Sequence, residues 1–206
     1  MSSAPQNISK SMSLLSFQRD LLPAMPWKNG GGSTSEIACW PLGSGLADFG
    51  WRVSIARISA AGPFSVFEGI DRSIMLLEGD GVRLKSRDGQ LDQLLHEPLQ
   101  PFDFSGDAAI DCTLLGGPSS DFNVMTRRGQ WHAEVRVLAS AAALAAAPHG
   151  VLMCLRGSWS LGPSGQACGT GQGWCWTEAA QAWQVAPQTS DAQLVVACIR
   201  PARLSS

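Results

Sequence analysis

The stretch that decides the fold is WRVSIARI, residues 51–58. Trp51 and Val53 fall on one side of an extended chain, and Arg52 and Ser54 fall on the other. This period of two predicts a β-strand with one apolar face and one polar face. We therefore expect the segment to lie in a sheet whose apolar face packs against another layer.

Short runs of the same kind recur on both sides of this stretch. Glycine and proline, 22 and 12 residues, separate the runs at intervals of about 8 to 12 residues, which is typical of an all-β sandwich or barrel. In residues 34–40, strict alternation places Thr34, Glu36 and Ala38 on one face. The turn at residues 78–81 needs positive φ at its glycines. The other predicted strands span residues 72–77, 82–85, 111–115, 122–125 and 131–138.

Helical patterns are rare in this chain. Residues 139–147 are rich in alanine, the residue with the highest helix propensity, and Pro148 ends the run. We expect a short helix there. A second, weaker pattern predicts a turn of helix within residues 10–22.

A short repeat indicates an internal duplication. Ile74-Met75-Leu76-Leu77-Glu78-Gly79 resembles Leu152-Met153-Cys154-Leu155-Arg156-Gly157, and each copy precedes a short extended stretch that ends in leucine. Duplication of a small β-barrel leaves such a trace. We therefore divide the chain into residues 15–128, which carry the candidate site, and residues 129–204, which are structural.

Composition excludes several classes of function. The net charge is −2, and no stripe of lysine and arginine marks a nucleic-acid partner. Residues 1–10 are polar, and the chain has no apolar run of about 18 residues, so we expect neither an export signal nor a membrane span. Six scattered cysteines are interpreted as reduced, packed thiols. The expected location is the cytoplasm.

Histidine is too scarce for a typical metal site. The three histidines, His96, His132 and His149, fall in different predicted elements and form no closely spaced pair. A metal centre of the usual kind needs several histidines and a carboxylate that converge. We therefore expect no bound metal and no other cofactor.

The glycine-rich run after Trp27 is the first candidate binding site. Gly30 and Gly31, with a third glycine next to them, allow backbone N–H groups to converge on an anion. Lys28 would add positive charge, and Asn29 would add a directional amide. The alternative is a flexible loop that leads into the strand at residues 34–40.

Arg52 is the second candidate. If the apolar face of its strand packs outward, Arg52 and Ser54 point into the interior of a barrel. An arginine there needs a counter-charge, because an unpaired buried charge is unfavourable. That charge is either Glu36, on the same face as Thr34, or the carboxylate of a bound ligand.

Two further polar positions follow the same reasoning. Arg72 would act as a second carboxylate clamp with Asp71 capping the turn, or the two residues would form a turn-stabilising pair. Asn123 points away from its apolar neighbours Phe122 and Val124. It would reach into a pocket, or it would be an internal amide at a bulge.

Several blocks of the sequence resemble the HutD/Ves family. They cover about residues 15–138, and the remainder more loosely. The blocks are MPWKNGGGSTSEI (25–37), FGWRVSIA (49–56), GPFS (62–65), GIDR (69–72) and DFNVMTRR (121–128). The resemblance implies an all-β fold of two fused cupin-like (double-stranded β-helix) half-barrels, which form a bicupin. It further implies a link to bacterial histidine utilisation, where such a protein is thought to sense a small metabolite.

The residues and the resemblance together predict a non-enzymatic regulatory protein. It would bind a small acid such as urocanate or N-formylglutamate through the two arginines, with Trp27, Asn29 and Asn123 shaping the site. The alternative is a metal-independent isomerase or hydrolase with Glu36 or His132 as general base. We expect no nucleic-acid or membrane partner, and a homodimer is left open.

Overall fold

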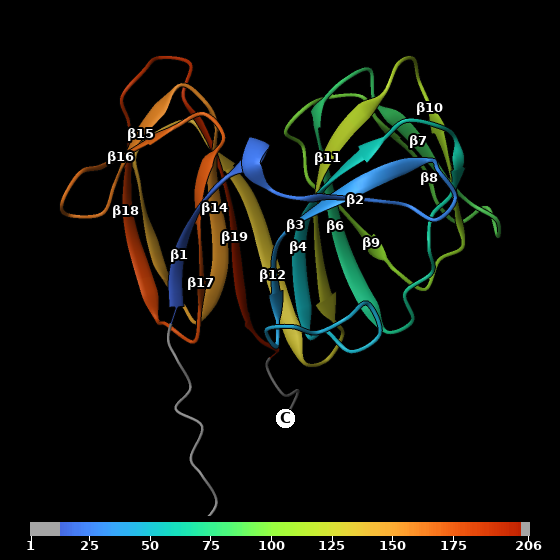
Figure 1. Cartoon of the computed structure of the whole chain (residues 1–206), viewed down its shortest axis with the longest axis horizontal. Coiled ribbons are helices and arrows are strands. Elements are labelled where there is room, and N and C mark those ends of the chain that lie inside the picture. Colours follow the sequence, from blue (N-terminus) through green and yellow to red (C-terminus); the bar gives the residue numbers. More distant parts are fainter. Residues whose placement is uncertain (1–12, 203–206) are drawn as a thin grey trace, which may run out of the picture.

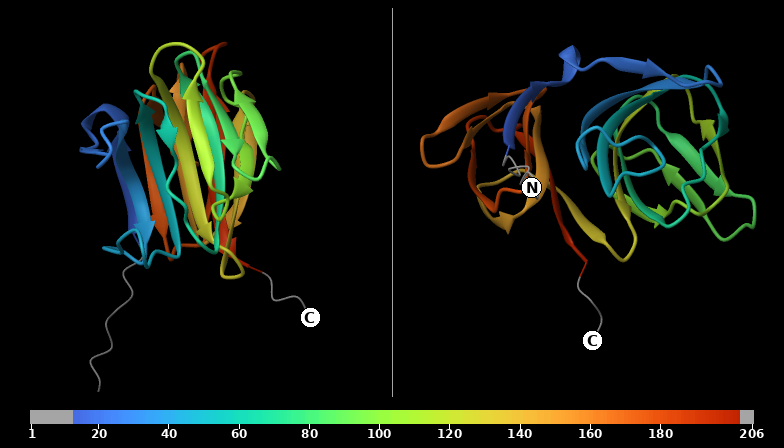
Figure 2. Two further views of the ribbon diagram at one scale, coloured as in Figure 1. Left: turned by 90° about the vertical axis from the view of Figure 1, so that its right-hand side faces the viewer. Right: turned by 60° about the horizontal axis from the view of Figure 1, so that its bottom comes forward.

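A computed structural model describes residues 13–202 as two β-sheet lobes side by side (Figures 1 and 2). In each lobe two sheets pack around a core of buried side chains. Within these residues the only helical element is the 3₁₀ turn Arg19–Leu21, and no helix is long and apolar enough to cross a membrane. The prediction of an all-β fold is confirmed.

The first lobe, on the right in Figure 1, contains a six-stranded and a four-stranded sheet. All of its strand pairs are antiparallel. The larger sheet has the order β2 (Ala24–Pro26), β3 (Gly32–Trp40), β4 (Trp51–Ile58), β11 (Ser119–Arg127), β6 (Ile70–Glu78) and β9 (Phe102–Ser105). The smaller has the order β5 (Gly62–Pro63), β10 (Ile110–Leu114), β7 (Val82–Ser86) and β8 (Asp92–Leu95).

The second lobe contains a five-stranded and a four-stranded sheet, again antiparallel throughout. The larger has the order β1 (Ser13–Gln18), β17 (Gln172–Thr177), β14 (His149–Arg156), β19 (Gln193–Pro201) and β12 (Trp131–Leu138). The smaller has the order β13 (Ala142–Ala147), β18 (Gln181–Pro187), β15 (Ser158–Leu161) and β16 (Gln166–Gly169).

Apart from β1, β2 and β3, the two lobes follow one plan. Strands β4 to β11 are ordered β4-β11-β6-β9 and β5-β10-β7-β8, and strands β12 to β19 are ordered β12-β19-β14-β17 and β13-β18-β15-β16. The two copies of the sequence repeat form β6 and β14, which occupy equivalent places. Gly79 (φ +98°) and Gly157 (φ +66°) begin the turn after each.

The first strand joins the second lobe, although the chain enters the first lobe next. β1 pairs with β17 from Ser13 opposite Thr177 to Gln18 opposite Gln172. The turn of helix predicted within residues 10–22 is present as the 3₁₀ turn Arg19–Leu21, whereas residues 13–18 form β1 and residues 10–12 lie outside the described part. Residues 15–18, which the sequence division assigned to the first half, extend a sheet of the second lobe.

The helix predicted over residues 139–147 is also wrong. Residues 142–147 form β13, which pairs with β18 and places Leu144 opposite Trp183. Leu144 and Ala147 are buried in the core of the second lobe. The helix preference of alanine amounts to only tenths of a kcal/mol per residue, so strand pairing and burial beside a large aromatic ring outweigh it.

The predicted two faces of β4 are confirmed. Trp51, Val53 and Ile55 point towards the second lobe and pack in one apolar cluster with residues of β14 and β19. Arg52 and Ser54 consequently lie on the opposite face, inside the first lobe. The partners from the second lobe are Val151, Met153, Cys175, Val195, Ala197 and Ile199.

A bulge changes the alternation in β3. The register with β4 shifts between Glu36 and Ala38, so that Ala38 pairs with Val53, and Cys39 pairs with Arg52. The expectation that Ala38 shares a face with Glu36 is therefore wrong, because the bulge inserts one extra residue. Glu36 pairs with Ser54 and therefore remains on the interior face of the sheet.

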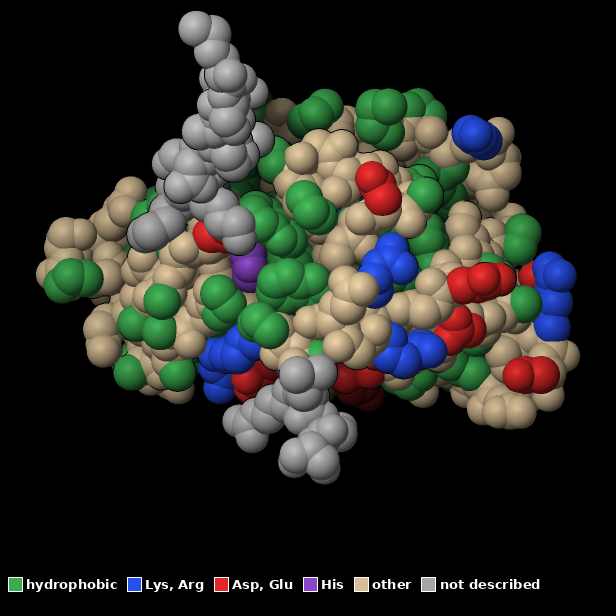
Figure 3. Space-filling model, turned by 90° about the horizontal axis from the view of Figure 1, so that it is seen from below, with side chains coloured by type: hydrophobic (Ala, Val, Ile, Leu, Met, Phe, Trp, Pro, Cys, Tyr) green, Lys and Arg blue, Asp and Glu red, His purple; other side chains and the backbone are tan. Residues whose placement is uncertain are grey.

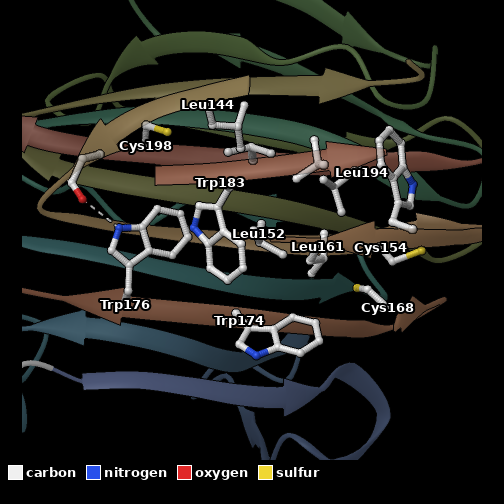
Figure 4. Packing of buried hydrophobic residues seen from close by; sticks show 14 of the residues in the cluster. Leu144, Leu152, Cys154, Leu161, Cys168, Trp174, Trp176, Trp183, Leu194 and Cys198 are labelled. Atoms are coloured by element: carbon white, nitrogen blue, oxygen red, sulfur yellow. Dashed lines mark hydrogen bonds between the residues drawn. The ribbon is translucent and has the colours of Figure 1, made fainter. Parts of the chain in front are cut away.

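The second lobe has a core rich in tryptophan (Figure 4). Trp159, Trp174, Trp176 and Trp183 are all buried. The Trp176 Nε1 group donates a hydrogen bond of 2.9 Å to the carbonyl of Ala147. All six cysteines are free and buried, which fits their interpretation as packed thiols.

Candidate functional site

The polar side chains of the first-lobe interior begin with an ion pair. The Arg52 Nε group donates to Glu36 Oε2 at 2.7 Å. The Arg52 side chain is 14% exposed and that of Glu36 is 43% exposed, so the pair lies at the margin of the interior. The predicted counter-charge of Arg52 is thus in place, while Arg52 keeps two Nη groups that donate to no other described residue.

Arg72 is the second guanidinium of this interior. Its Nε and Nη2 groups donate to Asn123 Oδ1 at 3.3 and 3.1 Å. The rings of Phe64, Phe67 and Phe104 surround the guanidinium carbon, with centroids 5.0 to 5.8 Å away. Enclosure by protein lowers the pKa of Arg72 to about 10, with a contribution from neighbouring positive charge. The group remains charged at neutral pH.

The predicted inward direction of Asn123 is confirmed by this contact. Asn123 pairs with Ser54 on β4 and Ile74 on β6, both of which also face inward. Its amide therefore holds an arginine, and no shift in register occurs at its position. The earlier expectation of a turn pair between Asp71 and Arg72 is not met, since the two side chains lie on opposite faces of β6.

Asp121 is a functional candidate that sequence reasoning missed. Its side chain is on the interior face of β11, two residues before Asn123, and is buried. Neither carboxylate oxygen has a hydrogen-bond partner among the described residues. Burial raises the pKa of Asp121 to about 7, and the positive charge of Arg72 opposes this shift. The signal was its period-two spacing from Asn123.

Apolar clusters lie on both sides of these polar groups. One contains Ile58, Ile74 and Leu84, with Trp27 packed against it. The other contains Phe49 and residues near it at the ends of β6 and β11. Arg52, Arg72, Asn123 and Asp121, with Glu36 and Ser54, form the polar layer of the first lobe, the name used below.

The glycine-rich run lies away from Arg52 and near the Asp121 end of this layer, because Thr34 and Asp121 pair with Ala56 from its two sides. Gly32 pairs with Ile58, whereas Arg52 pairs with Cys39, so six residues, roughly 20 Å of strand, separate the two ends. The Trp27 Nε1 group donates to Thr34 Oγ1 at 2.7 Å, and Asn29 Oδ1 accepts from the Gly31 N–H at 3.0 Å.

These contacts hold the connection between β2 and β3 in a tight turn. Lys28, Asn29 and Gly30 are exposed, and Gly30 has a φ of +71°. Gly32 must be glycine, because a Cβ there would lie 2.1 Å from the carbonyl oxygen of Arg57. Of this run, only Trp27 and Thr34 contribute side chains to the interior, and Lys28 and Asn29 are not brought to Arg52.

Asp71 belongs to a different cluster on the surface. Its Oδ1 atom accepts from Arg128 Nε at 2.7 Å, and Arg128 also donates to Asp107 Oδ2 at 2.6 Å. Asp107 accepts from the Gly69 N–H as well, and these bonds lower its pKa to about 2. Asp71 therefore stabilises the turn before β6, as one of the sequence alternatives proposed, but with Arg128 as its partner.

His132 lines a pocket outside the polar layer. This pocket, of about 330 Å³, lies between the outer face of the first lobe and β12, and Asp71, Ser73 and Thr126 border it. Arg72 also borders it, although its side chain points inward. A larger pocket of about 580 Å³ lies where the β3–β4 loop meets the turn between β11 and β12. Figure 3 shows this end of the molecule, where acidic and basic side chains gather around apolar ones.

The polar layer is suited to binding anions. No group of three or more His, Cys, Asp or Glu residues within 13–202 is arranged to hold a metal ion. Burial, with the nearby Asp121, raises the pKa of Cys112 to about 12, so this thiol stays protonated and is a poor nucleophile. Two guanidinium groups and an amide, by contrast, are the usual ligands of a carboxylate.

A family model described as HutD matches residues 19–195. The chain belongs to the HutD family. Protein Ves from Citrobacter koseri is 40% identical over 156 residues, which are 75% of this chain and 78% of that protein. An uncharacterized 21.2 kDa protein in the hutC 3′ region of Pseudomonas putida is 48% identical over 117 residues, 55% of this chain and 58% of that one.

Solved structures agree with this membership. HutD from Pseudomonas fluorescens SBW25, in a formate condition, has a TM-score of 0.80 and 30% identity, and the match covers 93% of this chain and 100% of that one. A cupin 2 conserved barrel domain protein from Leptotrichia buccalis has a TM-score of 0.57 at 8% identity, covering 90% and 96% of the two chains. That likeness shows that the fold of this HutD-family chain is cupin-like.

Proposed function

We propose that this protein is a non-enzymatic regulator that binds a small carboxylic acid in the polar layer of its first lobe. Arg52 and Arg72 hold the carboxylate, and Asn123 fixes the direction of Arg72. Glu36 is the resident counter-charge, and the ligand carboxylate competes with it for Arg52.

One observation carries this proposal. Arg72 is a charged side chain among three aromatic rings, and its only hydrogen-bond acceptor within residues 13–202 is the neutral Asn123 amide. A guanidinium in such surroundings favours an anion that accepts two parallel hydrogen bonds. Arg52 and Arg72 pair with Met125 of β11 from its two sides, so their side chains leave the sheet on the same face.

The fold supports a bicupin, with a binding lobe and a structural lobe. Two successive sets of eight strands have the same order in paired sheets, which is the trace of a duplicated double-sheet barrel. The polar layer occurs in residues 15–128, whereas the core of the second lobe is dominated by tryptophan. We therefore assign ligand binding to the first cupin-like half and a supporting role to residues 129–204.

The metabolite context comes from the family. A 48% identical relative from Pseudomonas putida is named for its place in the hutC 3′ region, which fits the link to histidine utilisation that the family resemblance implies. Urocanate and N-formylglutamate are small acids of that pathway and are the ligands we propose. Six free, buried cysteines fit a reducing compartment such as the cytoplasm.

The test is isothermal titration calorimetry with urocanate and N-formyl-L-glutamate. We expect the wild-type protein to bind at least one of them, and both Arg52→Ala and Arg72→Met to weaken that binding at least tenfold. Arg83→Met is the matched control, because Arg83 forms an exposed pair with Asp92 outside the lobe interior. It should leave the affinity unchanged.

Two results would overturn the proposal. The first is that neither acid produces heat of binding at high protein concentration. The second is an affinity that Arg72→Met leaves at the wild-type value. Recovery of the acid unchanged after long incubation with the protein is the expected result for a binder, whereas formation of a product would indicate an enzyme.

A further inference from the structure

Asp121 is a buried carboxylate that accepts no hydrogen bond from any residue that the structure describes. Its backbone pairs with Ala56 on β4 and Leu76 on β6, and its neighbour Phe122 points to the interface between the lobes. The carboxylate therefore points into the first lobe, where it is 4% exposed. Both of its oxygens lack a hydrogen-bond donor among residues 13–202.

Two other acceptors of the layer each accept from an arginine. Glu36 accepts from Arg52, and Asn123 accepts from Arg72. The charge of Arg72 acts on the Asp121 carboxylate, yet Arg72 donates no hydrogen bond to it. Buried polar groups are nearly always hydrogen-bonded in folded proteins, so an unpaired carboxylate in a binding layer indicates a position that a ligand fills.

We propose that Asp121 is a specificity residue, which accepts a hydrogen bond from an N–H or O–H group of the bound acid. This inference rests on the proposed function, since Arg52 and Arg72 hold the other end of the same ligand. Asp121 lies two residues, about 7 Å, along β11 from Asn123, and Asn123 is the residue to which the Arg72 guanidinium is hydrogen-bonded. The donor and the carboxylate of the ligand are separated by a similar length.

This placement defines a class of ligand. A small acid that carries a ring N–H, an amide N–H or a hydroxyl at its far end satisfies Asp121. A plain monocarboxylate leaves Asp121 unpaired, and a dicarboxylate that has no such donor brings a second negative charge against it. Both are therefore bound more weakly than a donor-bearing acid of the same size.

Two matched pairs of probes test this by calorimetry at pH 8, where Asp121 is ionised. Urocanate has a ring N–H, and 3-(2-furyl)acrylate has the same acrylate with a ring that lacks a donor. N-formyl-L-glutamate has an amide N–H that glutarate lacks. We expect the wild-type protein to bind the donor-bearing member of at least one pair at least tenfold more tightly.

The variant Asp121→Leu is expected to remove this preference. Affinity for the donor-bearing probe should fall at least tenfold, while affinity for the matched probe that lacks the donor changes less than threefold. Asp121→Asn retains one acceptor oxygen and the shape of the side chain, and it should keep part of the preference. It also provides a folded variant if the leucine protein does not fold, with near-ultraviolet circular dichroism as the check.

The outcomes separate this inference from the proposed function. Acids that bind through Arg72 with no preference within either pair, or an equal loss for both probes in Asp121→Leu, would overturn the role of Asp121 alone. If no probe binds the wild-type protein, the carboxylate site and the role of Asp121 are both wrong.

Discussion

At the level of single residues, the bond between Arg72 and Asn123 is the contact on which the polar layer depends. Asn123→Leu leaves a guanidinium among phenylalanine rings without an acceptor, so we expect the free energy of unfolding to fall by about 2 kcal/mol. In the Arg72→Met background the same change should cost less than about 1 kcal/mol. Urea unfolding of the four proteins measures this difference.

The control for this cycle is again Arg83→Met, which should cause no measurable change, because exposed ion pairs contribute little. Arg72→Met alone is expected to stay within about 1 kcal/mol of the wild type, since an apolar side chain of similar length replaces a partly buried charge. An equal cost of Asn123→Leu in both backgrounds would show that the amide does not stabilise the arginine.

Asp121 makes stability depend on pH. Its pKa is raised to about 7, so the folded protein binds this proton more tightly than the unfolded chain does. The free energy of unfolding therefore decreases as pH rises from about 4 to about 7 and then levels off, by at most about 4 kcal/mol for this group. Chemical denaturation at pH 4.5, 6 and 8 should show the decrease in the wild type and a smaller one in Asp121→Asn. Parallel pH profiles for the two proteins would contradict this.

The side chains of the site were predictable only in part. Alternation along β4 and β11 was enough to place Arg52 and Asn123 inside the lobe, because each has apolar neighbours that need the opposite face. Lys28 and Asn29 are exposed and are not brought to Arg52, and the sequence could not show this, since a run of glycines looks the same in a binding loop and in a tight connection. Asp121 was not singled out, because nothing in the sequence shows that a carboxylate lacks a partner.

At the level of elements, the turn between β6 and β7 depends on its second glycine. Gly81 has a φ of +91°, and a Cβ there would lie 2.1 Å from the carbonyl oxygen of Leu95. Gly89 has a φ of +77° but open space around it. We expect Gly89→Ala to cost about 1 kcal/mol from backbone conformation alone, and Gly81→Ala to cost about 3 kcal/mol or more. Denaturant unfolding compares them, and equal costs would exclude the close approach.

The strands that alternate were predictable, and the two segments that do not alternate were not. Residues 51–58 and 131–138 are strands with the predicted bounds. Residues 142–147 were predicted as helix because alanine has a local helix preference. The pairing that overrides this preference joins Leu144 to Trp183, which lies 39 residues later in the sequence. The same holds for β1, whose partner β17 lies at the far end of the chain.

At the level of the whole molecule, the repeat predicted a duplication but not how its halves are joined. The two lobes share an apolar interface between their larger sheets, and β1 of the chain's first segment completes the second lobe (Figure 2). Residues 15–128 alone would carry β1 without its partner and would expose Trp51 and Val53. Separation of the lobes would therefore expose apolar surface that the intact chain buries.

This arrangement predicts that the two lobes unfold in one step. Differential scanning calorimetry should give a single transition with equal calorimetric and van't Hoff enthalpies. Val195→Asp places a charge at the fully buried interface and should lower the transition temperature of the entire molecule, since a buried unpaired charge costs several kcal/mol. Leu42→Asp, on an 88% exposed residue, is the control and should leave the transition unchanged. Two separate transitions, with only one displaced by Val195→Asp, would show that the interface does not couple the lobes.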